Sequence, residues 1–151
     1  MEQRTEYEET LDLAETGQHR LALDSVRQRL AEAPEDAEAL NDAGVLLHCL
    51  KCSEDAVEHL EKARTLAPDS PEVIWNLVET YLAADKPHQA EPLFNDMEAM
   101  GILSADVLNR AANAFLNAGD IPAALRTLRR SLEFSPEQEI LKPMIEILEK
   151  A

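Results

Sequence analysis

Prolines recur along this chain at a fixed interval, and that interval restricts the fold more than any other feature of the sequence. Pro34 and Pro68 are 34 residues apart, Pro136 follows after twice that distance, and Ile102 stands at the skipped position. A constant period of this length is typical of proteins in which one small supersecondary unit repeats and each unit packs against its neighbours. We therefore divide the sequence into units at residues 3–36, 37–70, 71–104 and 105–138, followed by a capping helix at about 136–150.

Each unit carries the apolar pattern of two helices. In the second unit, small and large apolar residues stand at i, i+3, i+4 and i+7, and the same spacing resumes after a break. These residues are Leu40, Ala43, Gly44 and Leu47, then Ala56, Leu60 and Ala63. The fourth unit reproduces the pattern, and the first follows it least closely, with Arg29 where a small residue is expected. The pattern predicts a helical hairpin in each unit and an all-α chain.

Capping residues indicate the same helix boundaries. Side chains that accept hydrogen bonds from the first N–H groups of a helix precede the predicted helices; these are Asp36, Ser70 and Ser104 for the first helices, and Ser53 and Asp120 for the second helices. Gly101 is expected to end the second helix of the third unit. Residues 135–138 form a capping box that starts the final helix, and Pro143 is expected to kink or split that helix.

The period and the residues at these positions resemble the tetratricopeptide repeat, whose pattern runs W-x₂-L-G-x₂-Y, then A-x₃-F, then P over 34 residues. The resemblance covers residues 3–138. It implies a right-handed α-solenoid of helix-turn-helix repeats, with residues 1–151 as a single domain. It also implies that the first helix of each repeat lines a concave groove that binds a peptide or helix of a partner protein.

The charge of the chain argues against two classes of partner. Acidic residues outnumber basic ones by 30 to 14, which gives a net charge of −16. Such a charge repels nucleic-acid phosphates and anionic membrane surfaces. The polar N-terminus lacks the apolar run of an export signal, and two cysteines alone form no disulfide framework. We therefore expect a cytoplasmic protein that binds neither nucleic acid nor membrane.

No motif for catalysis or metal binding stands out. Cys49 and Cys52 form a C-x₂-C pair next to His48, but a structural zinc site needs four ligands, and only His59 is a plausible further one. The histidines fall in different hairpins and turns, and no phosphate loop or nucleophile elbow is present. We expect a protein that is not an enzyme and that uses no cofactor and no metal.

The candidate site is the stripe of each first helix that its own hairpin does not need for packing. Its partner-binding candidates are Tyr7, Leu11, Asn41, Val45, His48, Trp75, Asn76, Glu79, Leu82, Asn109, Arg110, Asn113 and Leu116. Trp75 is the sole tryptophan, and tryptophan is over-represented among binding hot spots. The alternative is that Trp75 packs between repeats and that the asparagines form hydrogen bonds between repeats or face solvent.

The charge of this stripe predicts the chemistry of its partner. Together with Glu15 the stripe holds seven acids against Arg4 and Arg110, so a basic or apolar segment fits it better than an acidic tail. Arg126, Arg129 and Arg130 form a separate basic group on a second helix. That group is either a solvated face or a contact for weak self-association into homo-oligomers. A further alternative is that the chain is a regulatory or scaffolding module of a larger enzyme, such as a transferase.

Overall fold

The computed structural model describes residues 5, 6, 8–10 and 18–151, and the described residues contain helices and no strand. Contacts between Cα atoms divide the chain into two compact units, Met1–Thr80 and Tyr81–Ala151. We refer to them as the N-terminal and the C-terminal unit and describe each by itself. That residues 1–151 form one domain stays a prediction. None of the helices in the described part combines the length and apolarity needed to span a membrane.

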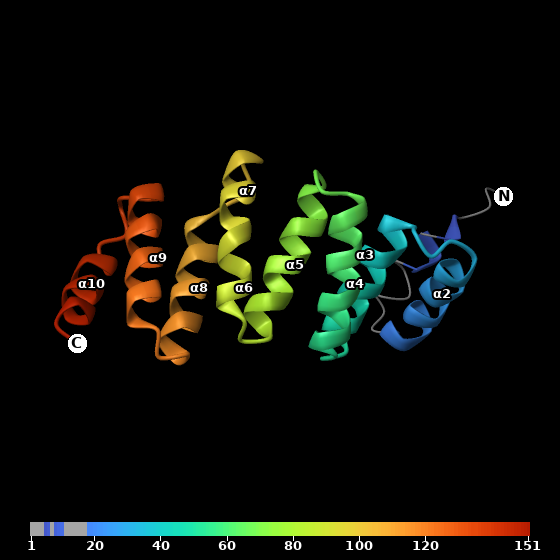
Figure 1. Ribbon diagram of the computed structural model, residues 1–151, viewed down its shortest axis with the longest axis horizontal. Helices are drawn as coiled ribbons and strands as arrows, with labels where there is room; N and C mark the ends of the chain where they lie inside the picture. Colours follow the sequence, from blue (N-terminus) through green and yellow to red (C-terminus); the bar gives the residue numbers. More distant parts are fainter. Residues whose placement is uncertain (1–4, 7, 11–17) are drawn as a thin grey trace. The chain divides into compact units, whose positions relative to one another are not determined.

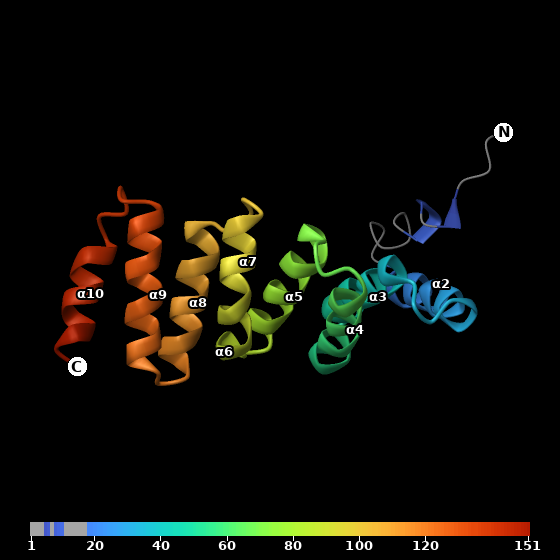
Figure 2. The ribbon, with the colours of Figure 1, turned by 45° about the horizontal axis from the view of Figure 1, so that its top comes forward.

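The N-terminal unit is a stack of helices that lie side by side in chain order (Figures 1 and 2). They are α2 (His19–Glu32), α3 (Ala37–Cys49), α4 (Ser53–Leu66) and α5 (Pro71–Ala83), the last of which runs a few residues beyond the unit. Ala22, Val26, Ala43 and Leu47 are buried where α2 meets α3. A second cluster joins α3, α4 and α5 through Leu40, Ala63 and Val73.

Gly44 allows the closest approach within the hairpin of α3 and α4. A Cβ atom at this position would lie 2.4 Å from Cγ of Leu60, whose side chain is completely buried. The glycine of the repeat pattern therefore lets α4 pack directly on the backbone of α3.

The C-terminal unit holds a second set of helices stacked in chain order (Figure 1). They are α6 (Pro87–Ala90), the 3₁₀ segment η1 (Glu91–Leu93), α7 (Phe94–Ala99), α8 (Ala105–Asn117), α9 (Ile121–Phe134) and α10 (Leu141–Glu149). The sequence predicts one helix where α6, η1 and α7 stand. Pro92 lies inside η1 and has no N–H to donate to the preceding turn, which explains the change of helix type there.

Most predicted helix starts are confirmed. α3, α5 and α8 begin at Ala37, Pro71 and Ala105, which are 34 residues apart. The carboxylate of Asp36 accepts a hydrogen bond from the N–H of Ala39 at 3.0 Å, and Asp120 caps α9 in the same way at 3.0 Å. Ser70 and Ser104 also cap their helices, with 3.3 Å bonds from the N–H groups of Val73 and Val107. Gly101 follows α7 with a φ of 73°.

Three predicted features in or near other helix starts are wrong. Ser53 is the first residue of α4, and the N-cap is Cys52, whose side chain makes no capping bond. The final helix begins at Leu141, because residues 135–140 form turns. Pro143 therefore falls in the first turn of α10, where its missing N–H has no intrahelical partner to lose, and α10 runs unbroken to Glu149.

Candidate partner-binding surface

In the N-terminal unit, α3 and α5 are joined by a ladder of side-chain amides. The Nδ2 of Asn76 donates to Oδ1 of Asn41 at 3.0 Å, and Nδ2 of Asn41 donates to Oε1 of Glu72 at 3.3 Å. Asn41 is only 4% exposed. Both polar ends of the Asn41 amide therefore have partners inside the protein, in agreement with the alternative of hydrogen bonds between repeats.

The ladder brings several of the predicted residues onto one face, which we call the α3–α5 surface. Its members are Glu38, Val45, His48, Glu72, Trp75, Asn76 and Glu79. Trp75 is 37% exposed, a large fraction for the largest apolar side chain of the protein. Val45, His48, Asn76 and Glu79 are half-buried. Tryptophan is over-represented among the residues that carry most of the binding energy in protein interfaces.

The α3–α5 surface is acidic without compensation from its own helices. The sequences of α3 and α5 contain Glu38, Asp42, Glu72 and Glu79, and neither helix contains a lysine or an arginine. A ligand that approaches this surface therefore meets carboxylates and no fixed cation on the two helices that form it.

Asp42 is a partly buried carboxyl beside the α3–α5 surface, and Arg29 is its ionic partner. The pKa of its carboxyl is raised to about 6: burial is the main cause, the charges of Glu38 and Glu72 add to the rise, and Arg29 opposes it. The Nη1 of Arg29 lies 3.4 Å from Asp42 Oδ2, and its Nη2 lies 3.6 Å from Asp36 Oδ2. The side chains of Arg29 and Asp42 are each only 12% exposed. Arg29, which departs from the repeat pattern, thus supplies the counter-charge for two aspartates.

In the C-terminal unit, the amide of Asn109 is also bonded within the protein. Its Nδ2 donates to Oε1 of Gln138 at 2.7 Å, and its Oδ1 accepts from the Ser131 hydroxyl at 2.6 Å. Gln138 completes the network by donating to the carbonyls of Ser131 and Ser135, both at 3.0 Å. The repeat pattern does not predict this network, because it assigns Gln138 to the final helix, whereas Gln138 lies in the loop before α10.

The other candidates of the C-terminal unit differ in what they offer a ligand. Asn113 and Arg110 are exposed, and Arg110 lies 4.0 Å from the carboxylate of Asp106. Leu116 is half-buried against Phe115, and Leu82 is only 8% exposed. The remaining two candidates, Tyr7 and Leu11, lie outside the described residues.

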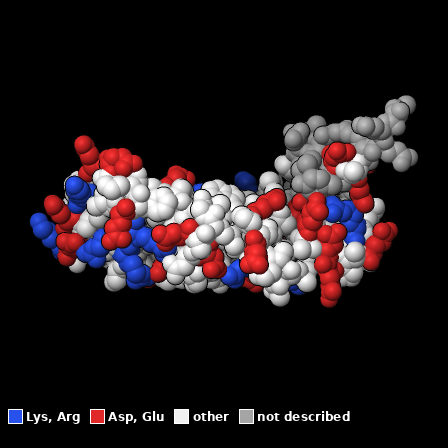
Figure 3. All heavy atoms as spheres, turned by 90° about the horizontal axis from the view of Figure 1, so that it is seen from above, with Lys and Arg blue, Asp and Glu red and all other residues white. Residues whose placement is uncertain are grey.

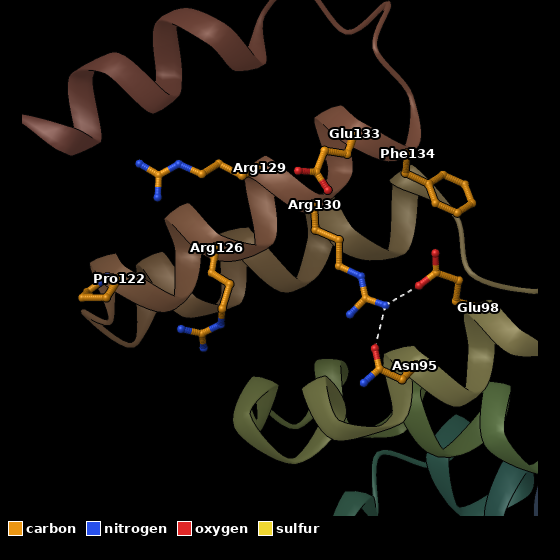
Figure 4. A pocket seen from close by; sticks show the side chains of 8 residues that line it. All are labelled: Asn95, Glu98, Pro122, Arg126, Arg129, Arg130, Glu133 and Phe134. Atoms are coloured by element: carbon orange, nitrogen blue, oxygen red, sulfur yellow. Dashed lines mark hydrogen bonds and ion pairs between the residues drawn. The ribbon is translucent and has the colours of Figure 1, made fainter.

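The basic residues of α9 line an open groove of about 1000 Å³ in the C-terminal unit. Figure 4 shows the side chain of Arg130 reaching from α9 toward Asn95 and Glu98. Phe134, at the end of α9, is 46% exposed. The groove is lined by Asn95, Glu98, Pro122, Arg126, Arg129, Arg130, Glu133 and Phe134.

Each of the three arginines already has an acidic partner. Figure 3 shows Lys and Arg side chains interspersed with Asp and Glu at the end of the molecule that carries α9 and α10. The pairs are Arg126 with Glu91 at 2.9 Å, Arg129 with Glu149 at 2.7 Å and Arg130 with Glu98 at 2.7 Å. The three arginines are therefore paired within the protein, and weak self-association through this face stays a prediction.

The cysteine pair forms no recognisable metal centre. Cys49 ends α3, Cys52 precedes α4, and both are free and exposed. Among residues 5, 6, 8–10 and 18–151, no group of three or more His, Cys, Asp or Glu side chains is placed to hold a metal ion.

Comparison with known proteins agrees with the helical repeats. Two sequence profiles of the tetratricopeptide repeat match the chain, one over residues 7–71 and the other over residues 54–101. No curated protein matches the sequence. Together the two matches span residues 7–101, which is more than half of the chain.

Solved structures of MamA share this fold. MamA MSR-1 is 21% identical, with a TM-score of 0.72 over 96% of this chain and 83% of its own. MamA from Desulfovibrio magneticus RS-1 is 15% identical, with a TM-score of 0.74 over 95% of this chain and 81% of its own. At sequence identities this low, the similarity to MamA shows a shared fold only. The chain therefore belongs to the tetratricopeptide repeat family, a family of protein-interaction modules.

Proposed function

We propose that the chain acts by binding, as an adaptor that holds an extended segment or a helix of a partner protein on its first helices. The observation that carries this proposal is the exposed Trp75 on the α3–α5 surface; among the other described aromatic residues, Tyr81, Phe94 and Phe115 are buried, and Phe134 is exposed. Large apolar side chains on a surface mark interaction sites when polar groups surround them. Here the surrounding groups are Glu72, Asn76 and Glu79.

The predicted residues have different roles in the proposed site. Asn41 and Asn109 hold helices together, since both ends of each amide are bonded within the protein. Val45, His48 and Trp75 provide apolar area on the α3–α5 surface. Asn113 and Arg110 are exposed on α8 of the C-terminal unit and remain candidates there, and Tyr7 and Leu11 remain part of the proposal from their place in the repeat.

The negative charge of the α3–α5 surface predicts the charge of the partner segment. A basic segment suits the four carboxylates of α3 and α5, an apolar segment suits Trp75 and Val45, and an acidic tail would be repelled. The proposal thus names a class of partner that is rich in Lys, Arg or apolar residues.

A capture experiment with a matched control tests this proposal. Wild type, Trp75→Ala and Leu66→Ala would each be immobilised and exposed to a lysate of the source cells. Leu66 is a suitable control because it is also a large apolar side chain, 43% exposed, but lies at the end of the second helix α4. Far-UV circular dichroism would confirm that the three proteins have the same helical content.

We expect Trp75→Ala to lose proteins that wild type and Leu66→Ala both retain. Cross-linking from α3 and α5 would then place the captured segment. If Trp75→Ala captures the same proteins as wild type, or if both variants lose them equally, binding at the α3–α5 surface is refuted.

A further inference from the structure

We propose that the exposed side of α10 docks an amphipathic helix of a partner protein on Ile140, Met144 and Ile147. The docked helix would present aliphatic side chains that recur with the helical period. This inference goes beyond the proposed function, because it assigns a second contact surface, in the C-terminal unit, that does not involve the α3–α5 surface.

Ile140 and Ile147 are the two most exposed large apolar side chains in the described part of the chain, at 70% and 71%. Met144, between them, is half-buried. Residues at i, i+4 and i+7 lie on the same face of an α-helix. Ile140 belongs to this geometry, because its backbone is in the αR region and its carbonyl accepts from the N–H of Met144 at 3.4 Å. The three side chains therefore form one apolar stripe, which we call the α10 stripe.

The isoleucines of the α10 stripe are not the residues that hold α10 in the fold. Leu141 and Ile145 are buried on another face, in an apolar cluster with Leu128 of α9 and Ala112 of α8. A helix that only covers the end of a stack of repeats is expected to carry a polar outer face. Packing within the C-terminal unit therefore explains one apolar face of α10 and leaves the stripe without a structural role.

Hydrogen bonds to α8 and α9 fix the segment that leads into the stripe. The side chain of Gln138, two residues before Ile140, accepts from Nδ2 of Asn109 at 2.7 Å and donates to the carbonyl of Ser131 at 3.0 Å. The start of α10 is thus tied to both preceding helices. A surface that is already ordered loses less conformational entropy when a partner binds.

The repeat places the α10 stripe in register with an exposed candidate residue of α8. Counting 34 residues back from Ile147 reaches Asn113, which is exposed. The register holds in the structure, because the buried Ile145 corresponds in the same way to the buried Ala111. Since successive repeats stack on one another, a partner that contacts the exposed side of α8 can continue onto the stripe.

The size of the stripe favours a longer partner over a dimer of this chain. α10 has nine residues. A helix of that length is about 14 Å long, and a strip of about 10 Å width along it covers roughly 140 Å². A stable interface buries about 800 Å² on each partner. Two copies joined through α10 alone would therefore separate, whereas a partner that also contacts α8 can bury more area.

The aliphatic chemistry of the stripe favours a helix over an extended segment. Ile140, Met144 and Ile147 have no side-chain N–H or oxygen to bond to a peptide backbone. An extended segment buried against them would leave its own N–H and C=O groups without partners, which is costly. A helix bonds its backbone internally and presents apolar residues at i, i+3, i+4 and i+7, as helices in hydrophobic grooves do.

Methyl NMR of protein labelled at the isoleucine δ1 carbons tests the proposal. The chain has six isoleucines, and Ile74, completely buried on α5, is the internal control for Ile140 and Ile147. The probe is a blocked peptide of Leu, Ala, Lys and Glu with zero net charge and with leucines at i, i+3, i+4 and i+7. A second peptide of the same composition has its leucines in alternation with polar residues, the period of a strand.

We expect the helical peptide to shift the signals of Ile140 and Ile147, to leave that of Ile74 unchanged, and to bind about tenfold more tightly than the alternating peptide. Ile147→Gln should weaken binding about tenfold, as expected when one aliphatic side chain is lost from a contact. Leu66→Gln removes an exposed aliphatic side chain from α4 and is the matched control, with no expected change. Circular dichroism of each variant excludes unfolding as the cause of lost binding.

Equal binding of the two peptides, unchanged signals of Ile140 and Ile147, or an Ile147→Gln variant that binds as wild type does would overturn the docking site. A wild-type dimer in sedimentation velocity that Ile147→Gln abolishes would overturn it as well, because a second copy would then occupy the stripe. Trp75→Ala should bind the helical peptide normally, so this proposal and the one for the α3–α5 surface can fail separately.

Discussion

The contact between Gly44 and Leu60 allows a prediction that separates packing from helix propensity. The substitution is Gly44→Ala in the middle of α3. Measured by propensity alone, alanine should stabilise a helix interior relative to glycine by about 1 kcal/mol. The structure predicts the opposite sign, because the added methyl group has no room.

The magnitude follows from the distances. The new Cβ would lie 2.4 Å from Cγ and 2.7 Å from Cδ2 of Leu60, whereas carbon atoms in contact prefer about 3.5–4.0 Å. Leu60 is 0% exposed and cannot turn into solvent, so α3 and α4 must move apart. Forced overpacking of a core costs about 1–3 kcal/mol, and the short contact with the buried Leu60 puts the cost here at about 2–3 kcal/mol, from which the gain of about 1 kcal/mol in helix propensity is subtracted. We expect Gly44→Ala to destabilise the N-terminal unit by about 1–2 kcal/mol.

Urea unfolding followed by Trp75 emission measures the effect, since Trp75 lies in the N-terminal unit. A double-mutant cycle with Leu60→Ala identifies the cause. Alone, Leu60→Ala should cost about 2–5 kcal/mol, and in the Gly44→Ala background it should cost less, because the new methyl group fills part of the space. A stabilising effect of Gly44→Ala, or additive effects in the cycle, would show that steric contact with Leu60 does not explain the glycine.

Three further predictions concern backbone conformation, surface charge and pH. Gly119 has a φ of 77° and open space around its Cα, so Gly119→Ala should cost about 1 kcal/mol in thermal unfolding through backbone strain alone. Arg126→Ala removes two hydrogen bonds to Glu91, of 2.9 and 3.0 Å. Because the ion pair is exposed, the free energy of unfolding should fall by less than about 1 kcal/mol, and urea unfolding at high salt should show no difference from wild type. The folded state raises the pKa of Asp42 from 3.8 to about 6, so it binds this proton more tightly than the unfolded chain does. The contribution of Asp42 to stability should therefore increase by about 1–3 kcal/mol as the pH falls from about 7 to 4.5, and Asp42→Asn should abolish that increase. A ¹³C titration that places the pKa of Asp42 near its ordinary value would contradict this prediction.

The sequence was sufficient to predict features that depend on local geometry. The starts of α3, α5 and α8 follow from the period, and the caps by Asp36 and Ser104 depend only on residues within one turn. The repeat pattern also indicates the close approach at Gly44. These features need no knowledge of how one hairpin lies on the next.

Features that depend on the offset between hairpins could not be predicted in the same way. The bond from Asn41 to Glu72 joins residues 31 apart, and that from Arg126 to Glu91 joins residues 35 apart. Side chains at such separations are brought together by the relative position of neighbouring helices, which apolar spacing does not specify. Position in the repeat therefore identifies the residues of the stripe. The structure is needed to separate the residues that bond to a neighbouring helix from those that are exposed to solvent.

That division also gives the strongest reason to regard Trp75 as a binding residue. Asn41, Trp75 and Asn109 are each the fifth residue of a first helix, in α3, α5 and α8. Both asparagines use an acceptor and a donor to bond within the protein. An indole has one N–H donor and no acceptor, so Trp75 cannot form the same pair of bonds. An asparagine at this position is sufficient for the hydrogen bonds between repeats. The large indole of the third repeat is 37% exposed, and contact with a partner protein explains its presence there.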